Sequence, residues 1–158
     1  VDFTARSALT LARRLYEARR PGGAVDERFS CFSLWRPLSP QPQDMPLALC
    51  DARSVRNDEG RANVKVDVDE IPTGNALFAS ITGEEDMVAA TIFHHSPDHR
   101  WWYFPDMTPD EVILIKFHDS DHSRAWRCPH TAFRDISRPD AVERRSIEFR
   151  GVAYFTRD

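Results

Sequence analysis

The stretch SIEFRGVAYF, residues 146–155, is rich in β-branched and aromatic side chains and predicts the last β-strand of the chain. On a strand, residues two apart point to the same face. Arg144, at the mouth of this strand, therefore shares a face with Ser146, whereas Arg145 and Ile147 face the other way. The stretch predicts a strand that presents a guanidinium group and a hydroxyl group side by side.

Other short segments have the same strand character. One of them alternates valines with charged residues, which is typical of a strand with one face in water. Turns rich in Pro, Gly and Asp separate the predicted strands, which are residues 29–35, 64–68, 87–93, 100–104 and 112–117. We expect a mostly β fold, a double-stranded β-helix (jelly roll, cupin-like), which these few strands leave incomplete.

One helix is expected before the strands. Apolar residues recur at helical spacing within residues 4–20, and a Pro-Gly-Gly sequence ends the pattern. Residues 36–46 contain so many prolines that we expect a long connection there. In the sequence MTPDE, Thr108 as a cap and Glu111 three residues later predict a short helical turn.

The composition fits one globular domain. Of 158 residues, 41% are hydrophobic and 29% are charged, and the net charge of -4 combines 21 basic with 25 acidic residues. No basic block points to nucleic acid, and no apolar run approaches the ~20 residues that cross a membrane. Cys31, Cys50 and Cys128 form no CxxC pair, which favours packing roles and a reducing, cytoplasmic location.

Two distant parts of the chain carry the residue types of a metal site. An iron(II) oxygenase holds its metal with two imidazoles and one carboxylate, which leaves positions for a cosubstrate and O2. Asp2 is the candidate carboxylate and His130 the candidate distal histidine, and the other histidine would stand immediately before Val1. The second carboxylate of a 2-oxoglutarate cosubstrate needs a donor fork with a hydroxyl beside it, and Arg144 and Ser146 form such a pair.

Four segments, in order along the chain, carry a resemblance to a known family. They are WRPLSPQPQDMPLALCDARSV (residues 35–55), HRWWYFPDMTPDEVILIKFHDS (99–120), PHTAF (129–133) and RRSIEFR (144–150). With them the chain resembles the fungal hydroxylase/desaturase family, which includes gibberellin desaturase-like and CmcJ-like cephamycin enzymes.

The resemblance implies an Fe(II)- and 2-oxoglutarate-dependent oxygenase that uses O2 to hydroxylate or desaturate a small secondary metabolite. It also implies that the opening Val1-Asp2 is the tail of a His-Val-Asp motif, which assigns the carboxylate role to Asp2 and the second imidazole role to His130. Residues 1–158 would then be the C-terminal portion of a longer chain with a single oxygenase-like domain.

Several neighbouring residues have two readings. Trp35 and Arg36, where a strand enters the proline-rich connection, either contact substrate or cosubstrate or make a structural pair. Arg150 lies on the same strand face as Arg144 and is an alternative carboxylate anchor. Tyr103 belongs to an aromatic stretch that forms either a core wall or a substrate cage.

The remaining histidines are weak candidates for a metal site. His118 and His122 have the i, i+4 spacing of a helical zinc pair, but the residues between them indicate a turn. His94 and His95 are adjacent on a predicted strand and so face opposite ways. We expect neither pair to hold an ion.

Two functions of other classes stay open. A catalytically inactive cupin-like binding or structural module would need no histidine before Val1. A methyltransferase ranks last, because the chain has no glycine-rich turn between a strand and a helix for a nucleotide cofactor. The residue encoded before Val1 separates the oxygenase from the inactive module.

Overall fold

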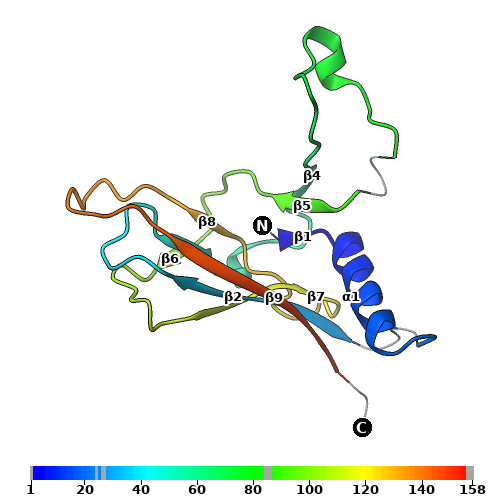
Figure 1. Cartoon of the computed structure of the whole chain (residues 1–158), viewed down its shortest axis with the longest axis horizontal. Helices are drawn as coiled ribbons and strands as arrows, with labels where there is room; N and C mark the ends of the chain where they lie inside the picture. The colour runs from blue at the N-terminus through cyan, green and yellow to red at the C-terminus, as the bar shows by residue number, and fades with distance from the viewer. Residues whose placement is uncertain (1, 24, 26–27, 84–86, 156–158) are drawn as a thin grey trace.

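The structure is a computed structural model that describes residues 2–23, 25, 28–83 and 87–155. Its described strands are antiparallel and form three sheets of three strands each, with one helix of several turns at one end (Figure 1). The elements are β1 (Asp2–Phe3), α1 (Ala5–Arg19), β2 (Phe29–Pro37), β3 (Leu47–Cys50), η1 (Ala52–Ser54), β4 (Arg61–Val64), η2 (Gly74–Phe78), β5 (Ala89–Ile92), β6 (Trp101–Tyr103), β7 (Ile113–Asp119), β8 (His130–Ala132) and β9 (Ser146–Tyr154). The predicted mostly β fold with one N-terminal helix is confirmed.

The longest pairing joins β2 to β9 in the sheet with the order β7-β2-β9. Its register runs from Phe29 opposite Tyr154 to Pro37 opposite Ser146, so β9 is paired along its whole length. On its other side β2 pairs with β7, and a register shift after Cys31 marks a β-bulge. Burial alternates along the second half of β2, so this sheet has an inner face and an outer face.

A second sheet, with the order β6-β3-β8, packs against the first. A shared cluster of buried side chains joins the two layers, with Trp35 of β2 and Leu47 of β3 as members from opposite sheets. Burying such large apolar side chains stabilises the fold by roughly 2 kcal/mol each. The cluster consists of Trp35, Leu47, Met107, Ile113 and Ile115.

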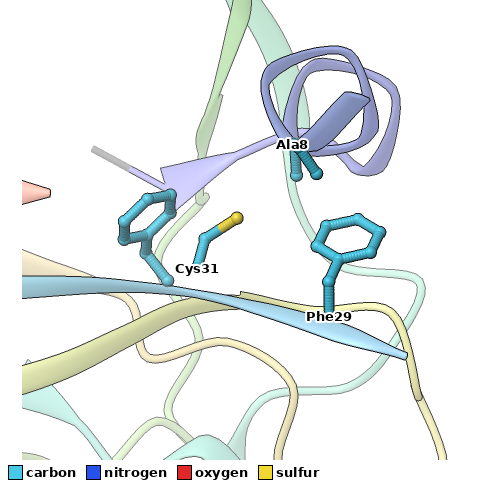
Figure 2. Packing of buried hydrophobic residues seen from close by; sticks show 5 residues of the cluster. Ala8, Phe29 and Cys31 are labelled. Carbon is cyan, nitrogen blue, oxygen red and sulfur yellow. The ribbon is translucent and has the colours of Figure 1, made fainter. Parts of the chain in front are cut away.

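Helix α1 covers one end of the β7-β2-β9 sheet. Thr4 caps it, because its Oγ1 accepts a hydrogen bond from the backbone N of Ser7 at 3.3 Å. Ala8 and Ala12 are fully buried, and Figure 2 shows Ala8 pointing between Phe29 and Cys31 of β2. Because alanine side chains are small, the helix approaches the sheet closely at these two positions. Both belong to the apolar face that the predicted helical pattern indicates.

The third sheet, with the order β1-β5-β4, lies beside α1, and the segment between β4 and β5 projects away from the body of the molecule (Figure 1). The predicted strand over residues 64–68 is wrong for most of its length. The observed strand β4 ends at Val64, opposite Ala89, and Val68 is 52% exposed. Alternation alone does not make a strand where the chain has no partner to pair with.

Three short strands, β1, β3 and β8, were not predicted, because two, four and three residues carry too little pattern to detect. At Thr108 the expected capping interaction is present: Glu111 Oε2 accepts hydrogen bonds from the Thr108 backbone N at 2.7 Å and from its Oγ1 at 3.0 Å. The backbone there makes a turn rather than a helix. Among the described residues, no helix combines the length and apolar character needed to cross a membrane.

Candidate functional site

His130 begins β8, where it stands opposite Leu49 of β3. Its Nδ1 lies 3.0 Å from the carbonyl oxygen of Cys128. Because a carbonyl only accepts hydrogen bonds, Nδ1 carries the hydrogen, and Nε2 is the nitrogen with the lone pair that a metal would use. Burial lowers the pKa of His130 despite this hydrogen bond, so the imidazole is neutral at physiological pH, as a metal ligand must be.

A charged cluster on the inner face of the other sheet acts on His130. Ser33 of β2 and Arg150 of β9 both donate to Glu148 Oε1, at 2.5 and 2.6 Å. Burial acts to raise the pKa of Glu148, and these two hydrogen bonds outweigh it, so the pKa is lowered and the carboxylate is ionised. The charges of Glu148 and Arg150 both influence the pKa of His130. The two sheets therefore bring His130 towards a guanidinium–carboxylate pair.

Arg144 precedes β9 on the same face and packs over Trp35. The guanidinium carbon lies 5.6 Å from the centre of the Trp35 ring. Arg144 Nε is one of three buried polar side-chain atoms without a hydrogen-bond partner among the described residues. Ser146, opposite Pro37, is exposed on the same side of the strand. An unsatisfied guanidinium nitrogen and a hydroxyl group on the same side of the strand match the donor set that a carboxylate ligand needs.

A cavity of about 430 Å³ lies beside His130. Its wall includes Thr91 of β5, Trp101 of β6 and His99 from the loop between these strands. Its volume falls within the range of small-molecule sites, roughly 300 to 1,000 Å³. A ligand in this cavity would contact the same histidine that is the candidate metal ligand.

The Asp2 side chain is outside the described part of the structure, but its backbone is placed. Asp2 lies in β1 opposite Thr91 of β5, and Thr91 lines the cavity that also contains His130. The strand that carries Asp2 therefore runs beside that cavity. Val1, where the predicted motif would begin, lies outside the described residues.

Two other candidates lie away from this group. Arg36 is exposed and stands opposite Ile147, on the other face of β2 from Trp35. Tyr103 is 42% exposed and packs edge to face on Phe133, with ring centres 5.0 Å apart. The structure thus places Arg144 against Trp35 and Arg150 within electrostatic reach of His130, whereas Arg36 lies on the other face of its sheet and Tyr103 packs on Phe133.

The other histidines form no metal cluster among the described residues. His118 lies in β7 and His122 in the turn that follows it, and the two rings meet edge to face with their centres 5.6 Å apart. His94 and His95 follow β5 in a loop, not on a strand as predicted, and both line the cavity beside His130. The prediction that His118 and His122 do not lie on a helix is confirmed.

Sequence reasoning did not identify Glu148, Ser33 or the pair formed by Glu59 and His99. For Glu148 a signal was present, because it alternates with Ser146 and Arg150 on one strand face. Ser33 and Glu59 gave none, since their partners are 115 and 40 residues away in the sequence.

Comparison with known proteins gives a consistent picture. A family profile described as an oxidoreductase/YMDC permease-like domain matches residues 1–154. The chain is 38% identical over 139 residues to hydroxylase/desaturase asaB of Aspergillus flavus, covering 81% of this chain and 56% of that protein. It is 34% identical over 158 residues to hydroxylase/desaturase efuI of Hormonema carpetanum, covering 98% of this chain and 50% of that protein. The predicted resemblance to fungal hydroxylase/desaturases is confirmed.

A solved structure has the same arrangement of strands. The iron and alpha-ketoglutarate-dependent endoperoxidase NvfI superposes with a TM-score of 0.76 at 27% identity, over 99% of this chain and 53% of that one. This similarity confirms the predicted cupin-like fold class. The chain spans about half the length of the relatives that it matches.

Proposed function

Since the chain belongs to the family described as an oxidoreductase/YMDC permease-like domain, we propose that it acts as an Fe(II)- and 2-oxoglutarate-dependent oxygenase. Its substrate would be a small secondary metabolite that it hydroxylates or desaturates with O2. Residues 1–158 would be the C-terminal portion of a longer oxygenase-like domain. The three free cysteines suit a reducing compartment such as the cytoplasm.

The observation that carries this proposal is the guanidinium of Arg144, which packs over Trp35 and whose buried Nε has no hydrogen-bond partner among the described residues. A guanidinium group whose hydrogen bonds are not satisfied within the protein favours an anionic ligand that accepts from it. The far carboxylate of 2-oxoglutarate is such a ligand, and Ser146 adds a hydroxyl donor on the same face.

The residues present also fit an iron ion. His130 offers Nε2 with a lone pair, and Asp2 stands on the strand beside the same cavity. Bound Fe(II) with 2-oxoglutarate would supply the activation of O2 and the oxidising power for a carbon–hydrogen bond. The hydrogen bond to Cys128 O fixes the ring orientation of His130, as partners of metal-bound histidines generally do.

The chain's other groups orient the reactants and exclude water. Trp35 is 6% exposed and holds the guanidinium of Arg144 against its ring face. The hydrogen bonds from Ser33 and Arg150 fix the Glu148 carboxylate, whose charge acts on His130. This fixed negative charge would help to neutralise the positive charge of a metal ion beside His130.

Anaerobic titration of the full-length protein tests the proposal. With Fe(II) and 2-oxoglutarate we expect a weak visible charge-transfer band, which His130→Ala abolishes. Arg144→Ala should weaken 2-oxoglutarate binding by about tenfold or more, because a hydrogen bond to a charged group contributes roughly 1.5 to 3 kcal/mol.

Matched controls come from neighbouring positions. His122→Ala removes an exposed histidine, and Arg145→Ala removes an exposed arginine that alternates with Arg144. Both variants should retain the charge-transfer band and the affinity for 2-oxoglutarate. A folded full-length protein that develops no band would instead favour the inactive cupin-like binding module.

A further inference from the structure

The cavity beside His130 contains a second histidine with a carboxylate partner. His99 Nε2 lies 2.9 Å from Glu59 Oε2, and the two side chains are 4% and 23% exposed. His99 lines the same cavity as His130, although the two are far apart in the sequence. A carboxylate that orients a buried imidazole is the arrangement by which proteins prepare a histidine to accept a proton.

The hydrogen bonds define which nitrogen of His99 is the acceptor. The pKa of Glu59 is lowered, first of all by its hydrogen bond with His99, so Glu59 is an ionised acceptor. Nε2 of His99 therefore carries the hydrogen, and Nδ1 has the lone pair. Nδ1 has no partner among the described residues and is not one of the three buried polar atoms without one, so it is accessible to solvent, and His99 is one of the residues that line the cavity.

The loop that carries Glu59 is held firmly in place. Arg127 Nη2 donates to the carbonyl oxygens of Arg56 and Glu59, at 2.9 and 2.6 Å. Glu59 Oε2 also accepts a hydrogen bond from the Arg56 backbone N at 2.9 Å. Gly60 has a φ of 104° and approaches Thr91 so closely that a Cβ would lie 2.6 Å from its Cγ2. These contacts fix the position of the Glu59 carboxylate in the absence of a ligand.

We propose that the Glu59–His99 pair recognises the substrate by accepting the hydrogen of an acidic hydroxyl group, a phenol or an enol, on a flat conjugated molecule. Nδ1 requires a donor on the ligand, and the rings of Phe93 and Trp101 in the same wall suit a planar apolar body. The inference rests on the proposed function for the role of the cavity, and it names the substrate class that this function would act on.

The proton step is balanced within the pair. The ligand's O–H bond breaks and an Nδ1–H bond forms on His99, so the ligand becomes an oxyanion hydrogen-bonded to an imidazolium. The Glu59 carboxylate, still accepting from Nε2–H, neutralises the positive charge of that imidazolium. His94 and His95 line the same cavity and are exposed, and neither has a carboxylate partner among the described residues.

Two dyes that differ by one methyl group test this inference on the full-length protein. The probe para-nitrophenol has an acidic hydroxyl group whose anion absorbs visible light, and para-nitroanisole replaces that hydrogen with a methyl group. We expect the protein to bind the phenol at least about tenfold more tightly than the ether and to shift the bound phenol towards the spectrum of its anion.

Variants assign that preference to the pair. His99→Phe keeps a ring in the wall and should make the two affinities equal, and Glu59→Gln should reduce the preference and the spectral shift. Asp58→Asn changes the adjacent carboxylate, which is exposed and paired with Arg56, and should change neither. If His99→Phe does not fold, His99→Gln keeps a donor towards Glu59 and removes the basic nitrogen.

The inference is overturned if the unmodified protein binds neither dye, binds both equally, or keeps its preference in the folded His99 variants. The assay contains neither iron nor 2-oxoglutarate. A failure of the oxygenase proposal would appear in the anaerobic titration instead, so the two results are distinguishable.

Discussion

The two ends of the inner face of the β7-β2-β9 sheet are built from the same strands and differ in chemistry. At the covered end, Phe29 and Cys31 pack beneath α1 (Figure 2), and Phe117 belongs to the same buried cluster. At the open end, two residues further along β2, Ser33 meets Glu148 and Arg150. Between Cys31 and Ser33 the face changes from apolar to charged, and at the next inward position of β2 it returns to the apolar Trp35.

The difference separates stability from function within one sheet. The covered end buries apolar area, which is the main favourable contribution to folding. The open end keeps charged groups on an inward face, where an apolar residue would be the simpler choice for stability. Sites that depart from the simplest choice for folding are those at which function is expected.

The largest predicted effect is at the covered end. Phe117→Ala removes a side chain that is 1% exposed and should lower the free energy of unfolding by about 3 to 5 kcal/mol. Leu114→Ala, on the outer face of the same strand and 62% exposed, should cost less than about 1 kcal/mol. Denaturant unfolding of both variants measures the contrast, and equal losses would remove the distinction between the two faces.

The next largest effect is expected from acid, through the buried His118, whose ring centre lies 5.7 Å from that of Phe29 at the covered end. Burial, with a contribution from His122, lowers the pKa of His118 to about 4, against about 6.5 in the unfolded chain. Between these two pH values the unfolded chain binds more protons than the folded chain. The contribution of His118 to the free energy of unfolding is therefore fully present above pH 6.5 and is lost as the pH drops towards 4. The loss should be on the order of 2 to 3 kcal/mol.

Unfolding measured across this pH window checks the prediction. His118→Phe should flatten the pH dependence, and His122→Asn, which changes an exposed histidine, should leave most of it. The buried Asp119 has a pKa that hydrogen bonds from Arg28 and Lys116, against the effect of burial, hold well below its usual value. Its contribution is lost only at lower pH, so it does not account for a change in this window.

The smallest effect on stability is expected at the open end. Glu148→Gln should change the free energy of unfolding by less than about 1 kcal/mol, because the pair with Arg150 is about a third exposed and screened by water. It should lower the pKa of His130, since the charge of Glu148 acts to raise it. NMR titration of His130 measures this change, with Glu143→Gln at an exposed position as the control. A large loss of stability would assign Glu148 to the core instead.

Much of the fold was predictable, because its longest elements carry a clear local pattern. The alternation in β9 placed Arg144, Ser146 and Arg150 on one face, and the helical spacing in α1 placed Ala8 and Ala12 against the sheet. These periods follow from backbone geometry alone and need no knowledge of a partner.

The sequence by itself therefore determined the strand and helix patterns, the mostly β class and the side of β9 that bears the arginines. Only the tertiary structure decided that His130 of β8 comes within electrostatic reach of Glu148, that Glu59 supports His99, and that the strand at residues 64–68 ends at Val64. The physical reason is that strand pairing and side-chain ion pairs require partners distant in the sequence, and a single strand's pattern does not specify which partner will be there.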